Sequence, residues 1–424
     1  MTKKTRTILF LIFLFLFLGI APAAIFYSQG YRFDIDSKKI TQTGGLFLKV
    51  EPKQAEIYVD GKLTKKTDFF FGSAFIENLL PKKYTIEVKK EGFYLWEKNL
   101  EIREKEVVEA KNIVLFPKNL NFNLLTKGVE DFWFSPDGKK IILKESSEKG
   151  WALKLYDAEK NIKSHLIEET DVYQKGADLM GLTFSEDSKE IYLDVGMKEQ
   201  EKTFALKLDK LPPVLNEKIP TENIPIENII IYKKINGDIY YLDNLGFLFK
   251  TDSSFGPRLK INEKPFPAKE ETEYEIYVFS DFVFLRENDT LYLFSPESKS
   301  FEKFFEGINA LKISPDNKKL VYLSDSEIWT LFLKEKYDQP TKKAGEKLFL
   351  LRLSEKIGDC FWLNPDYLIF NSGNRVKIAE IDDRDRINII DLVDFNNPKI
   401  FWDQANKKLY LLSEGNLFVS EKLF

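Results

Sequence analysis

The sequence has very few of the side chains on which most catalytic and metal sites are built. It contains one cysteine, Cys360, and one histidine, His165, in 424 residues. A Cys/His zinc site needs several such ligands, and a His-based triad needs a well-placed imidazole, whereas we expect His165 to be exposed on an outer strand. No glycine-rich phosphate loop is present. We therefore expect no catalytic residue, no cofactor and no metal site.

A single cysteine also excludes a disulfide within one chain, so stability has to come from packing alone. Cys360 lies in the segment Asp359–Trp362. Free cysteines are among the most buried residue types, so we expect a buried small side chain rather than a reactive thiol. No disulfide-linked partner is expected.

The sequence has no excess of positive charge outside its first residues. The formal net charge is −4. Residues 44–117 hold 13 basic and 12 acidic side chains, whereas residues 118–424 hold 44 basic and 53 acidic ones. An acidic domain repels a phosphate backbone, and no basic stripe with interleaved aromatics is present. We expect no nucleic-acid partner.

The feature that stands out is an unbroken apolar run, Ile8–Tyr27, near the N-terminus. Twenty helical residues rise about 30 Å, enough to cross the hydrocarbon core of a bilayer. The basic residues Lys3, Lys4 and Arg6 precede it and favour a cytoplasmic N-terminus. We interpret residues 1–6 as a cytoplasmic tip and 7–27 as a transmembrane signal anchor, with the membrane bound through residues 8–27.

The alternative interpretation of this run is a cleaved secretory signal. Ile8–Ile20 would form its apolar core and Ala21–Ala23 its cleavage site, so the chain would be secreted after cleavage near Ala23. The continuation of the run to Tyr27 favours a retained anchor. Both interpretations export the rest of the chain.

After a linker at 28–43, residues 44–117 show short strands with turn punctuation. Ala55–Val59 alternates with period two and runs into Asp60-Gly61, a pair favoured in tight hairpin turns. Asp60 is expected to serve the turn rather than a metal, because no second carboxylate stands at ligand spacing. Five or six strands in about 70 residues indicate a small β-sandwich.

This segment resembles the PEGA domain family. The resemblance is carried by the segments Val50–Pro52, Ala55–Lys62, Leu80–Val88 and Glu91–Phe93, although the four naming residues read Pro-Lys-Gln-Ala at 52–55. It implies an extracytoplasmic β module without known catalysis, common in surface proteins of bacteria and archaea.

Residues 118–424 contain repeats. Phe132–Leu143 aligns without gaps to Phe401–Leu412, and the turn aspartate recurs as Asp137, Asp187, Asp316 and Asp366. With weaker copies between them, the units number seven, each of roughly 40–50 residues, the period of four-stranded propeller blades. Departures from the repeat leave six to eight blades possible.

The repeats resemble the WD40-like propeller repeats of TolB-type proteins, whose mark is the Ser-Pro-Asp-Gly turn found in full at Ser135–Gly138. The last unit lacks a fourth strand, and a spare strand lies at 121–125. We therefore predict that strand 121–125 closes the ring by joining the last blade. The predicted fold is all-β: an N-terminal transmembrane helix, a PEGA-like sandwich and a β-propeller.

Other segments invite functional interpretation. Asp382–Arg386 is a dense charge cluster, which we interpret as a solvated hairpin tip rather than a calcium loop, because two arginines neutralise it. Two proline-rich stretches, at 211–225 and 256–267, are either a binding rim or uninformative loops.

The sequence predicts a membrane-anchored, non-enzymatic cell-surface protein that binds or scaffolds an unknown envelope polymer or protein. The alternative is a propeller-based extracytoplasmic glycan-active hydrolase or lyase that uses channel carboxylates. The inner strands are mostly apolar with few acids, which favours the first interpretation.

Overall fold

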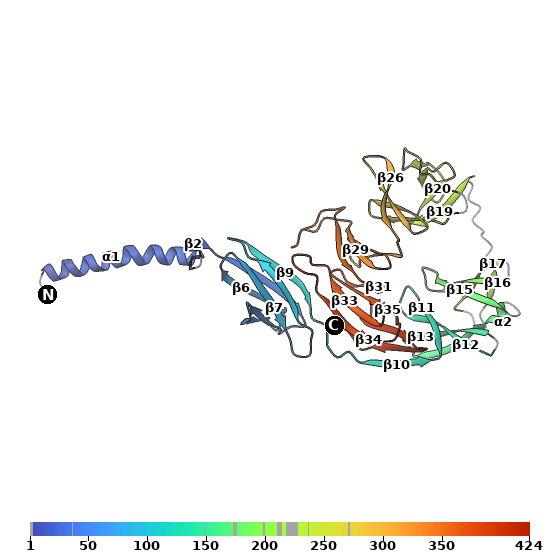
Figure 1. The fold of residues 1–424 in the computed structure, drawn as a ribbon, viewed down its shortest axis with the longest axis horizontal. Coiled ribbons are helices and arrows are strands. Elements are labelled where there is room, and N and C mark those ends of the chain that lie inside the picture. The colour runs from blue at the N-terminus through green and yellow to red at the C-terminus, as the bar shows by residue number, and fades with distance from the viewer. Residues whose placement is uncertain are drawn as a thin grey trace.

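The chain begins with a long apolar helix that leads into two β domains (Figure 1). The computed structural model describes residues 3–35, 37–148, 150–172, 176–197, 200–209, 214–217, 228–235, 237–269 and 272–424. Helix α1 (Lys3–Ser28) has a mean hydropathy of 2.9 over its most apolar window, and none of its residues is buried. By length and composition it is able to span a membrane or to act as a signal sequence.

A small hairpin holds the end of this helix. It consists of β1 (Tyr31–Asp34) and β2 (Lys39–Gln42). The Arg32 guanidinium lies 3.5 Å from the centre of the Tyr27 ring and donates to the Tyr27 carbonyl at 2.7 Å. Both contacts hold the first strand against the last turn of α1.

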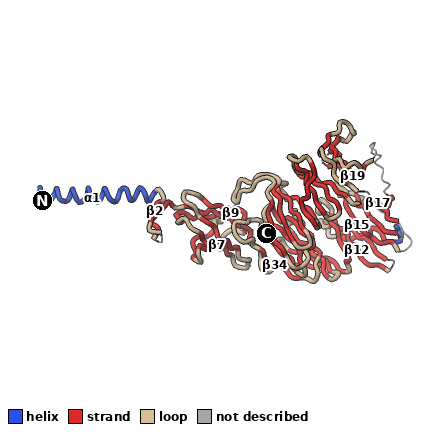
Figure 2. The backbone as a smooth tube through the Cα atoms, turned by 45° about the horizontal axis from the view of Figure 1, so that its top comes forward, coloured by secondary structure: helices blue, strands red, loops and turns tan. Residues whose placement is uncertain are grey.

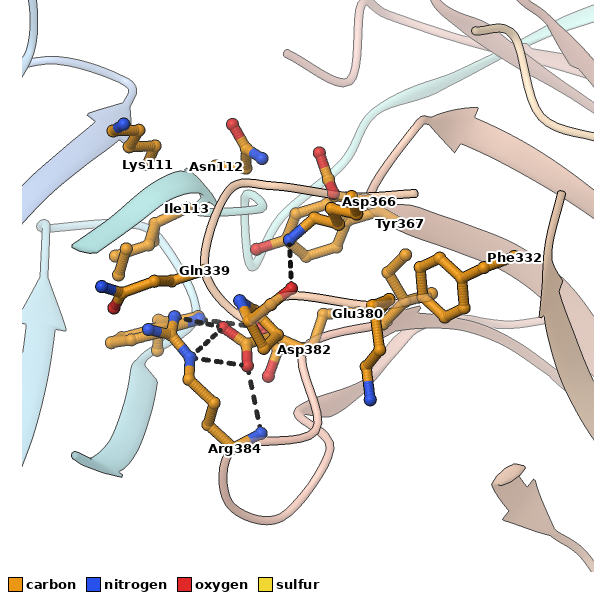
Figure 3. A pocket seen from close by; sticks show the side chains of 16 residues that line it. Lys111, Asn112, Ile113, Phe332, Gln339, Asp366, Tyr367, Glu380, Asp382 and Arg384 are labelled. Atoms are coloured by element: carbon orange, nitrogen blue, oxygen red, sulfur yellow. Dashed lines mark hydrogen bonds and ion pairs between the residues drawn. The ribbon is translucent and has the colours of Figure 1, made fainter. Parts of the chain in front are cut away.

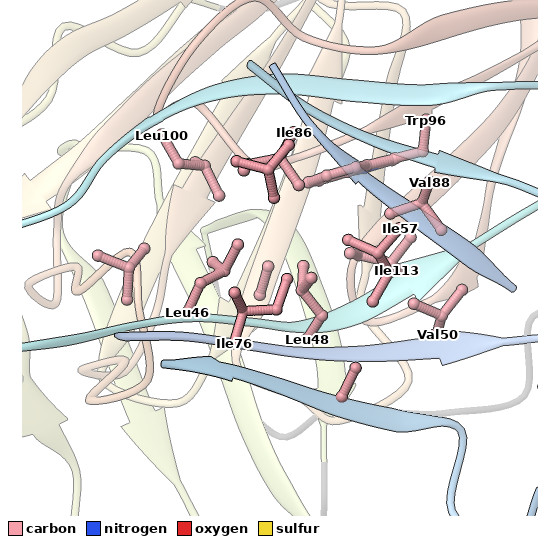
Figure 4. Close-up of a cluster of buried hydrophobic side chains, with 14 of the residues drawn as sticks. Leu46, Leu48, Val50, Ile57, Ile76, Ile86, Val88, Trp96, Leu100 and Ile113 are labelled. Carbon is pink, nitrogen blue, oxygen red and sulfur yellow. The ribbon is translucent and has the colours of Figure 1, made fainter. Parts of the chain in front are cut away.

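The first β domain is a sandwich of a three-stranded and a four-stranded sheet. The three-stranded sheet has the order β6 (Ser73–Leu79), β3 (Gly44–Glu51), β9 (Val107–Val114). The four-stranded sheet has the order β5 (Lys62–Lys66), β4 (Glu56–Val59), β7 (Lys83–Lys89), β8 (Trp96–Glu101). Alternate residues of both sheets point inward, among them Leu48, Ile57 and Ile86, each fully buried (Figure 4).

The hairpin turn of this sandwich follows the sequence pattern. Asp60 and Gly61 both have positive φ, 48° and 74°, as a type I′ turn requires. The Asp60 carboxylate accepts a hydrogen bond from the Thr85 amide at 3.0 Å. Asp60 therefore has the structural role expected of it.

The second β domain is a propeller of four-stranded antiparallel sheets (Figures 1 and 2). Seven such sheets lie within its described residues, and this confirms the predicted all-β class. Blade 1 comprises β11 (Val129–Phe134), β12 (Lys140–Ser147), β13 (Gly150–Asp157) and β14 (Ile162–Glu168). Blade 2 comprises β15 (Ala177–Phe184), β16 (Glu190–Met197), β17 (Gln200–Lys207) and β18 (Leu215–Glu217), and the short helix α2 (Glu169–Val172) precedes it.

The next three blades continue the same meander. Blade 3 comprises β19 (Ile229–Ile235), β20 (Asp238–Asp243), β21 (Leu248–Thr251) and β22 (Leu259–Lys260). Blade 4 comprises β23 (Tyr274–Phe279), β24 (Phe282–Glu287), β25 (Thr290–Ser295) and β26 (Ser300–Glu306). Blade 5 comprises β27 (Ala310–Ile313), β28 (Lys319–Leu323), β29 (Glu327–Phe332) and β30 (Lys347–Arg352).

The last two blades complete the domain. Blade 6 comprises β31 (Ile357–Asn364), β32 (Tyr367–Ser372), β33 (Arg375–Glu380) and β34 (Ile389–Asp394). Blade 7 comprises β35 (Lys399–Asp403), β36 (Lys408–Ser413), β37 (Asn416–Ser420) and, as its outer strand, β10 (Phe122–Lys127). β10 pairs antiparallel with β37, so the start of the domain supplies the strand that its end lacks.

The repeated turn is held by its serine and aspartate. In blade 1 the Ser135 hydroxyl donates to Asp137 at 2.5 Å and accepts from the Lys140 amide at 3.0 Å. Ser185 of blade 2 and Ser314 of blade 5 make the same two kinds of bond. The motif therefore persists as hydrogen bonding where its proline or glycine is replaced.

Buried apolar clusters join the blades at six of their seven junctions. The junction of blades 7 and 1 is among them, with Leu143 and Leu417 both fully buried. Among the described residues, no cluster joins blade 2 to blade 3. We call this junction of blades 2 and 3 the unpacked seam. On strand β16 of blade 2, Leu193 is fully buried on the face that packs against blade 1, whereas the next residue, Asp194, is exposed on the opposite face.

Of the two proline-rich stretches, only the second lies fully within the described residues. Most of 211–225 lies outside the described residues. In the stretch at 256–267, Asn262 is fully buried and its side chain bonds to the Leu248 amide and the Gly246 carbonyl. Phe266 is buried in the cluster between blades 3 and 4. Asn262 and Phe266 thus fix this second stretch to the blades, while residues 256–260, 263–265 and 267 are exposed.

We expect hydrogen exchange to reflect the unpacked seam. β16 and β32 are both second strands of their sheets, but β32 is buried at all six positions, whereas β16 is buried at alternate ones. Amides open locally where fewer apolar contacts hold them. Hydrogen-exchange mass spectrometry should show β16 exchanging well before β32, and equal protection would contradict a weak junction.

We also expect the single thiol to be inert in the folded protein. Cys360 is 1% exposed between blades 5 and 6, and burial raises its pKa to about 12. The thiolate is the reactive form, so a disulfide reagent near neutral pH should modify Cys360 only in denaturant. Rapid labelling of the native chain would contradict this placement.

Candidate functional site at the junction of the two domains

The sandwich meets the propeller along the edge formed by β8 and β9. In β8 the inward positions are Trp96, Lys98 and Leu100, so a lysine occupies a place where the alternation predicts an apolar residue. Lys98 is fully buried. Its ammonium reaches past the edge of the sandwich to blade 6 of the propeller.

The Lys98 ammonium finds three acceptors there. Its Nζ lies 2.6 Å from Glu380 Oε1, and it donates to the carbonyls of Asp382 at 2.7 Å and Arg386 at 2.9 Å. An ammonium has three donors, so all of them are used. This arrangement compensates the desolvation of a buried charge.

Glu380 is equally well satisfied. It is 3% exposed and accepts from the Trp96 indole at 2.9 Å and from the Asn388 side chain at 2.8 Å, besides pairing with Lys98. Burial raises the pKa of Glu380, and the adjacent Lys98 ammonium acts against that rise. A carboxylate with these partners is suited to fixing two domains together.

The charge cluster Asp382–Arg386 packs against the sandwich. The Arg384 guanidinium donates to the Glu109 carbonyl at 2.6 Å, and Asp385 accepts from the Asn99 backbone and side-chain amides at 2.8 and 2.9 Å. The Asp382 and Arg384 side chains are only 20% and 17% exposed. The interpretation of this segment as a solvated hairpin tip was wrong, because its charges find partners on the other domain.

Burial and ion pairing act in opposite directions on Asp382. Burial disfavours its charged form, but the Arg384 guanidinium binds both carboxylate oxygens and holds the pKa of Asp382 below its usual value. The loop therefore keeps its internal ion pair at neutral pH.

One glutamine covers the open edge of β9. The Gln339 side chain donates to the Val107 carbonyl at 3.1 Å and accepts from the Glu109 amide at 3.0 Å. Its amide thus takes the place of a neighbouring strand. Edge strands otherwise expose unpaired backbone groups.

A cleft remains beside this contact. It has a volume of about 450 Å³ and lies between the end of β8, the start of β9 and the segment 339–341. Charges of both signs line it: Glu101, Arg103, Glu106 and Arg384. A cleft of this size is in the range of ligand-binding sites. A second, smaller cavity of about 40 Å³ lies around Trp96, Asp366 and Glu380 (Figure 3).

Two acids on the inner strands of the propeller are held in ion pairs. Asp131 of β11 pairs with Lys399 of β35, and Glu275 of β23 pairs with Lys233 of β19 at 3.1 Å. Each pair joins neighbouring blades. In the described part of the chain, no three His, Cys, Asp or Glu side chains are grouped to hold a metal ion.

The isolated residues singled out in the sequence lie apart from this junction. His165 is exposed on β14, as expected. Cys360 is buried on β31. Among the residues that make the junction, Asp382–Arg386 was singled out but misinterpreted, whereas Lys98, Gln339 and Glu380 were missed. The lysine at an inward position of β8 was the signal for them.

Comparisons with known proteins bear on the fold alone. No family model and no curated protein matches the chain, so the resemblance to PEGA domains stays a prediction. The β-propeller domain of Cps50 (Swd1) from Myceliophteria thermophila is 12% identical, covering 72% of this chain and 99% of that one, with a TM-score of 0.41. Virginiamycin B lyase from Staphylococcus aureus is 14% identical over 72% and 99%, with a TM-score of 0.41.

A third solved structure is similar to the chain at a comparably low sequence identity. YCF48 from Cyanidioschyzon merolae is 10% identical, covering 71% of this chain and 98% of that one, with a TM-score of 0.42.

Removing one member of the buried pair should loosen the junction. We expect Lys98→Met to destabilise the protein by about 3–5 kcal/mol, since it leaves the Glu380 carboxylate buried without its counter-charge. The double variant Lys98→Met/Glu380→Gln should regain most of this loss. Thermal unfolding measures both, and additive effects of the two substitutions would contradict direct coupling.

The loss in Lys98→Met should also depend on pH. The folded-state pKa of Glu380 is already raised, so the folded state binds a proton more readily than the unfolded chain does. Stability then falls as pH rises through that pKa. Lys98→Met should cost less near pH 5 than near pH 8, about the range over which a raised carboxyl titrates.

Proposed function

We propose that this protein is a membrane-anchored, non-enzymatic display protein whose propeller binds an envelope polymer or protein outside the cell. Helix α1 is the anchor, and Lys3, Lys4 and Arg6 keep its N-terminus cytoplasmic. The sandwich is the connecting module. The propeller supplies the binding surfaces.

One observation carries the proposal: the junction fixes the propeller rigidly to the module that follows the anchor. The buried Lys98–Glu380 pair, the Arg384–Glu109 contact and the Gln339 bridge all join the two domains. Propeller and sandwich therefore move as one body. A rigid stalk orients a binding surface.

The ion pairs of the inner-strand acids and the mixed charges of the junction cleft support a binding role. Two of the inner-strand acids, Asp131 and Glu275, are engaged with lysines of adjacent blades. A glycosidase needs two free carboxyl groups at a defined separation. The junction cleft, with charges of both signs, suits a polar partner.

Cell fractionation with mass spectrometry of the N-terminus tests the anchor. We expect an intact N-terminus in the membrane fraction and a propeller that added protease removes from intact cells. The matched control is Lys3→Glu/Lys4→Glu/Arg6→Glu, which should lower the shaved fraction because the positive charges set the orientation.

Two outcomes would contradict the proposal. A mature chain that starts near Ala24 in the medium would show a cleaved signal and a secreted protein. Shortening of an envelope glycan by the purified protein would show an enzyme.

A further inference from the structure

The turn aspartate of blade 6 differs from its counterparts in the repeat. Asp137, Asp187 and Asp316 each accept a hydrogen bond from the serine two residues earlier, at 2.5, 2.7 and 2.5 Å. In blade 6, Asn364 takes the place of that serine and the bond is reversed, since the Asn364 side-chain oxygen accepts from the Asp366 amide at 2.8 Å. The Asp366 carboxylate is therefore released from the role that the repeat gives to this position.

The released carboxylate has no partner within the folded chain. Among the described residues, the Asp366 side chain makes no hydrogen bond and no ion pair. Burial raises the pKa of Asp366, so its charge is held at a cost to stability. Lys319 and Lys336 are near enough to act against that rise, although neither forms an ion pair with it. A polar group removed from water without a partner is suited to binding one from outside.

Asp366 borders a cavity in which two blades and the sandwich meet. The cavity has a volume of about 170 Å³. Blade 5 contributes Lys319 and the segment 334–338, and the sandwich contributes Asn112 of β9. Asn112, Lys336 and Asp366 also border the smaller cavity of Figure 3. Ligand sites occur preferentially at such domain interfaces.

The charges around this cavity limit the ligands that it suits. Among the described residues that line it, four are acidic and four are basic. A cation at Asp366 would be repelled by Lys319 and Lys336, and an anion would be repelled by the carboxylates. A neutral ligand with hydroxyl groups meets neither repulsion, because a hydroxyl donates to a carboxylate and accepts from an ammonium.

Lys336 is held in place to donate such a bond. Its ammonium donates to the carbonyls of Asp338 at 3.1 Å and Pro340 at 3.0 Å. Within the described structure, these bonds use two of its three donors. The backbones of Lys336 and Lys342 exchange two hydrogen bonds, at 2.9 and 3.0 Å, which close the loop that carries the cavity wall. One donor of Lys336 is thus left for a ligand.

An exposed aromatic ring lies at the rim of the cavity. Tyr337 is 83% exposed, more than any other described aromatic residue of the two β domains. Its hydroxyl donates to Glu335 at 2.6 Å, so the face of the ring is the part left for a partner. A flat apolar ring beside hydrogen-bonding groups matches a sugar, which has an apolar ring face and a rim of hydroxyls.

We infer that this cavity binds one sugar unit of a neutral glycan, with Asp366 and Lys336 on its hydroxyl groups and Tyr337 against its ring. The inference rests on the proposed function, for which it names the class of polymer and the site. A cavity of this volume admits a single ring, so the rest of the polymer lies outside it. One such site binds weakly, and many anchored copies on one polymer add avidity.

Titration of the full chain, held in phosphatidylcholine nanodiscs, with defined tetrasaccharides tests the ligand class. The probes are the neutral tetramers of glucose, N-acetylglucosamine, mannose and galactose, and the acidic tetramer of galacturonic acid. We expect at least one neutral tetramer to bind, and the acidic tetramer to bind at least about tenfold more weakly, because carboxylates line the cavity. Binding of no neutral tetramer, or a preference for the acidic one, would overturn the inference.

Two substitutions test the site. Asp366→Ala should weaken binding of the neutral tetramer about tenfold or more, since it removes a hydrogen bond to a charged group. Its midpoint of thermal unfolding should stay the same or rise, because no described partner is lost. The matched control is Asp137→Ala at the same turn position of blade 1, which should lower the midpoint and leave the affinity unchanged.

The ring of Tyr337 has its own pair of variants. Tyr337→Ala should weaken binding, whereas Tyr337→Phe keeps the ring and should retain the affinity. Unchanged affinity in Asp366→Ala or in Tyr337→Ala would overturn the inference. So would an Asp366→Ala chain that unfolds at a much lower temperature, because the carboxylate would then have a structural role.

The two proposals fail separately. Tetramer binding that Asp366→Ala leaves unchanged refutes this site and leaves a glycan-binding protein in place. Binding of no tetramer by a chain whose propeller is removed from intact cells by protease refutes the glycan and leaves an anchored protein that displays a binding surface. Cleavage of a bound tetramer refutes the non-enzymatic function, whereas the affinity of Asp366→Ala still decides the site.

Discussion

The arrangement of this protein depends on one buried ion pair, between Lys98 of the sandwich and Glu380 of the propeller. An ammonium and a carboxylate removed from water are costly unless every donor and acceptor is used. Here Trp96 and Asn388 complete the shell of Glu380, and two backbone carbonyls complete that of Lys98. Only one relative placement of the domains satisfies all of these groups, so the pair specifies an orientation as well as an attachment.

The blades of the propeller are joined by apolar packing rather than by a buried ion pair. Apolar clusters join six of the seven blade junctions, and the missing one among the described residues lies between blades 2 and 3. The first and last blades, where the ring closes, are held together by the pairing of β10 with β37 and by the buried Leu143 and Leu417. The seam therefore lies in the interior of the chain.

Local patterns were sufficient to predict much of the fold. Alternation and the Asp60-Gly61 turn predict the sandwich hairpin, and the Ser-Pro-Asp-Gly repeat predicts the blades, because both depend on neighbours in sequence. The strand expected at 121–125 lies at Phe122–Lys127 in the structure. It could be proposed because the last unit visibly lacks a strand.

The junction could not be predicted in the same way. Lys98 and Glu380 are nearly three hundred positions apart, and no local pattern connects them. A run of alternating charges such as Asp382–Arg386 is usually solvated, and only the approach of β8 turns it into a contact surface. The inward lysine of β8 was the one local irregularity, and it identifies a buried charge without identifying its partner.

The pairing of β10 with β37 also determines when this protein is able to finish folding. Asn121 and Glu421, 300 residues apart, are hydrogen-bonded at the end of this pair. The ribosome synthesises β10 early, and one edge of that strand stays unpaired until nearly all of the remaining chain has been made. During this interval the nascent chain exposes an unpaired strand to its neighbours, the situation that favours aggregation. The unpaired edge of β10 therefore needs protection, for example by a chaperone, until translation is almost complete.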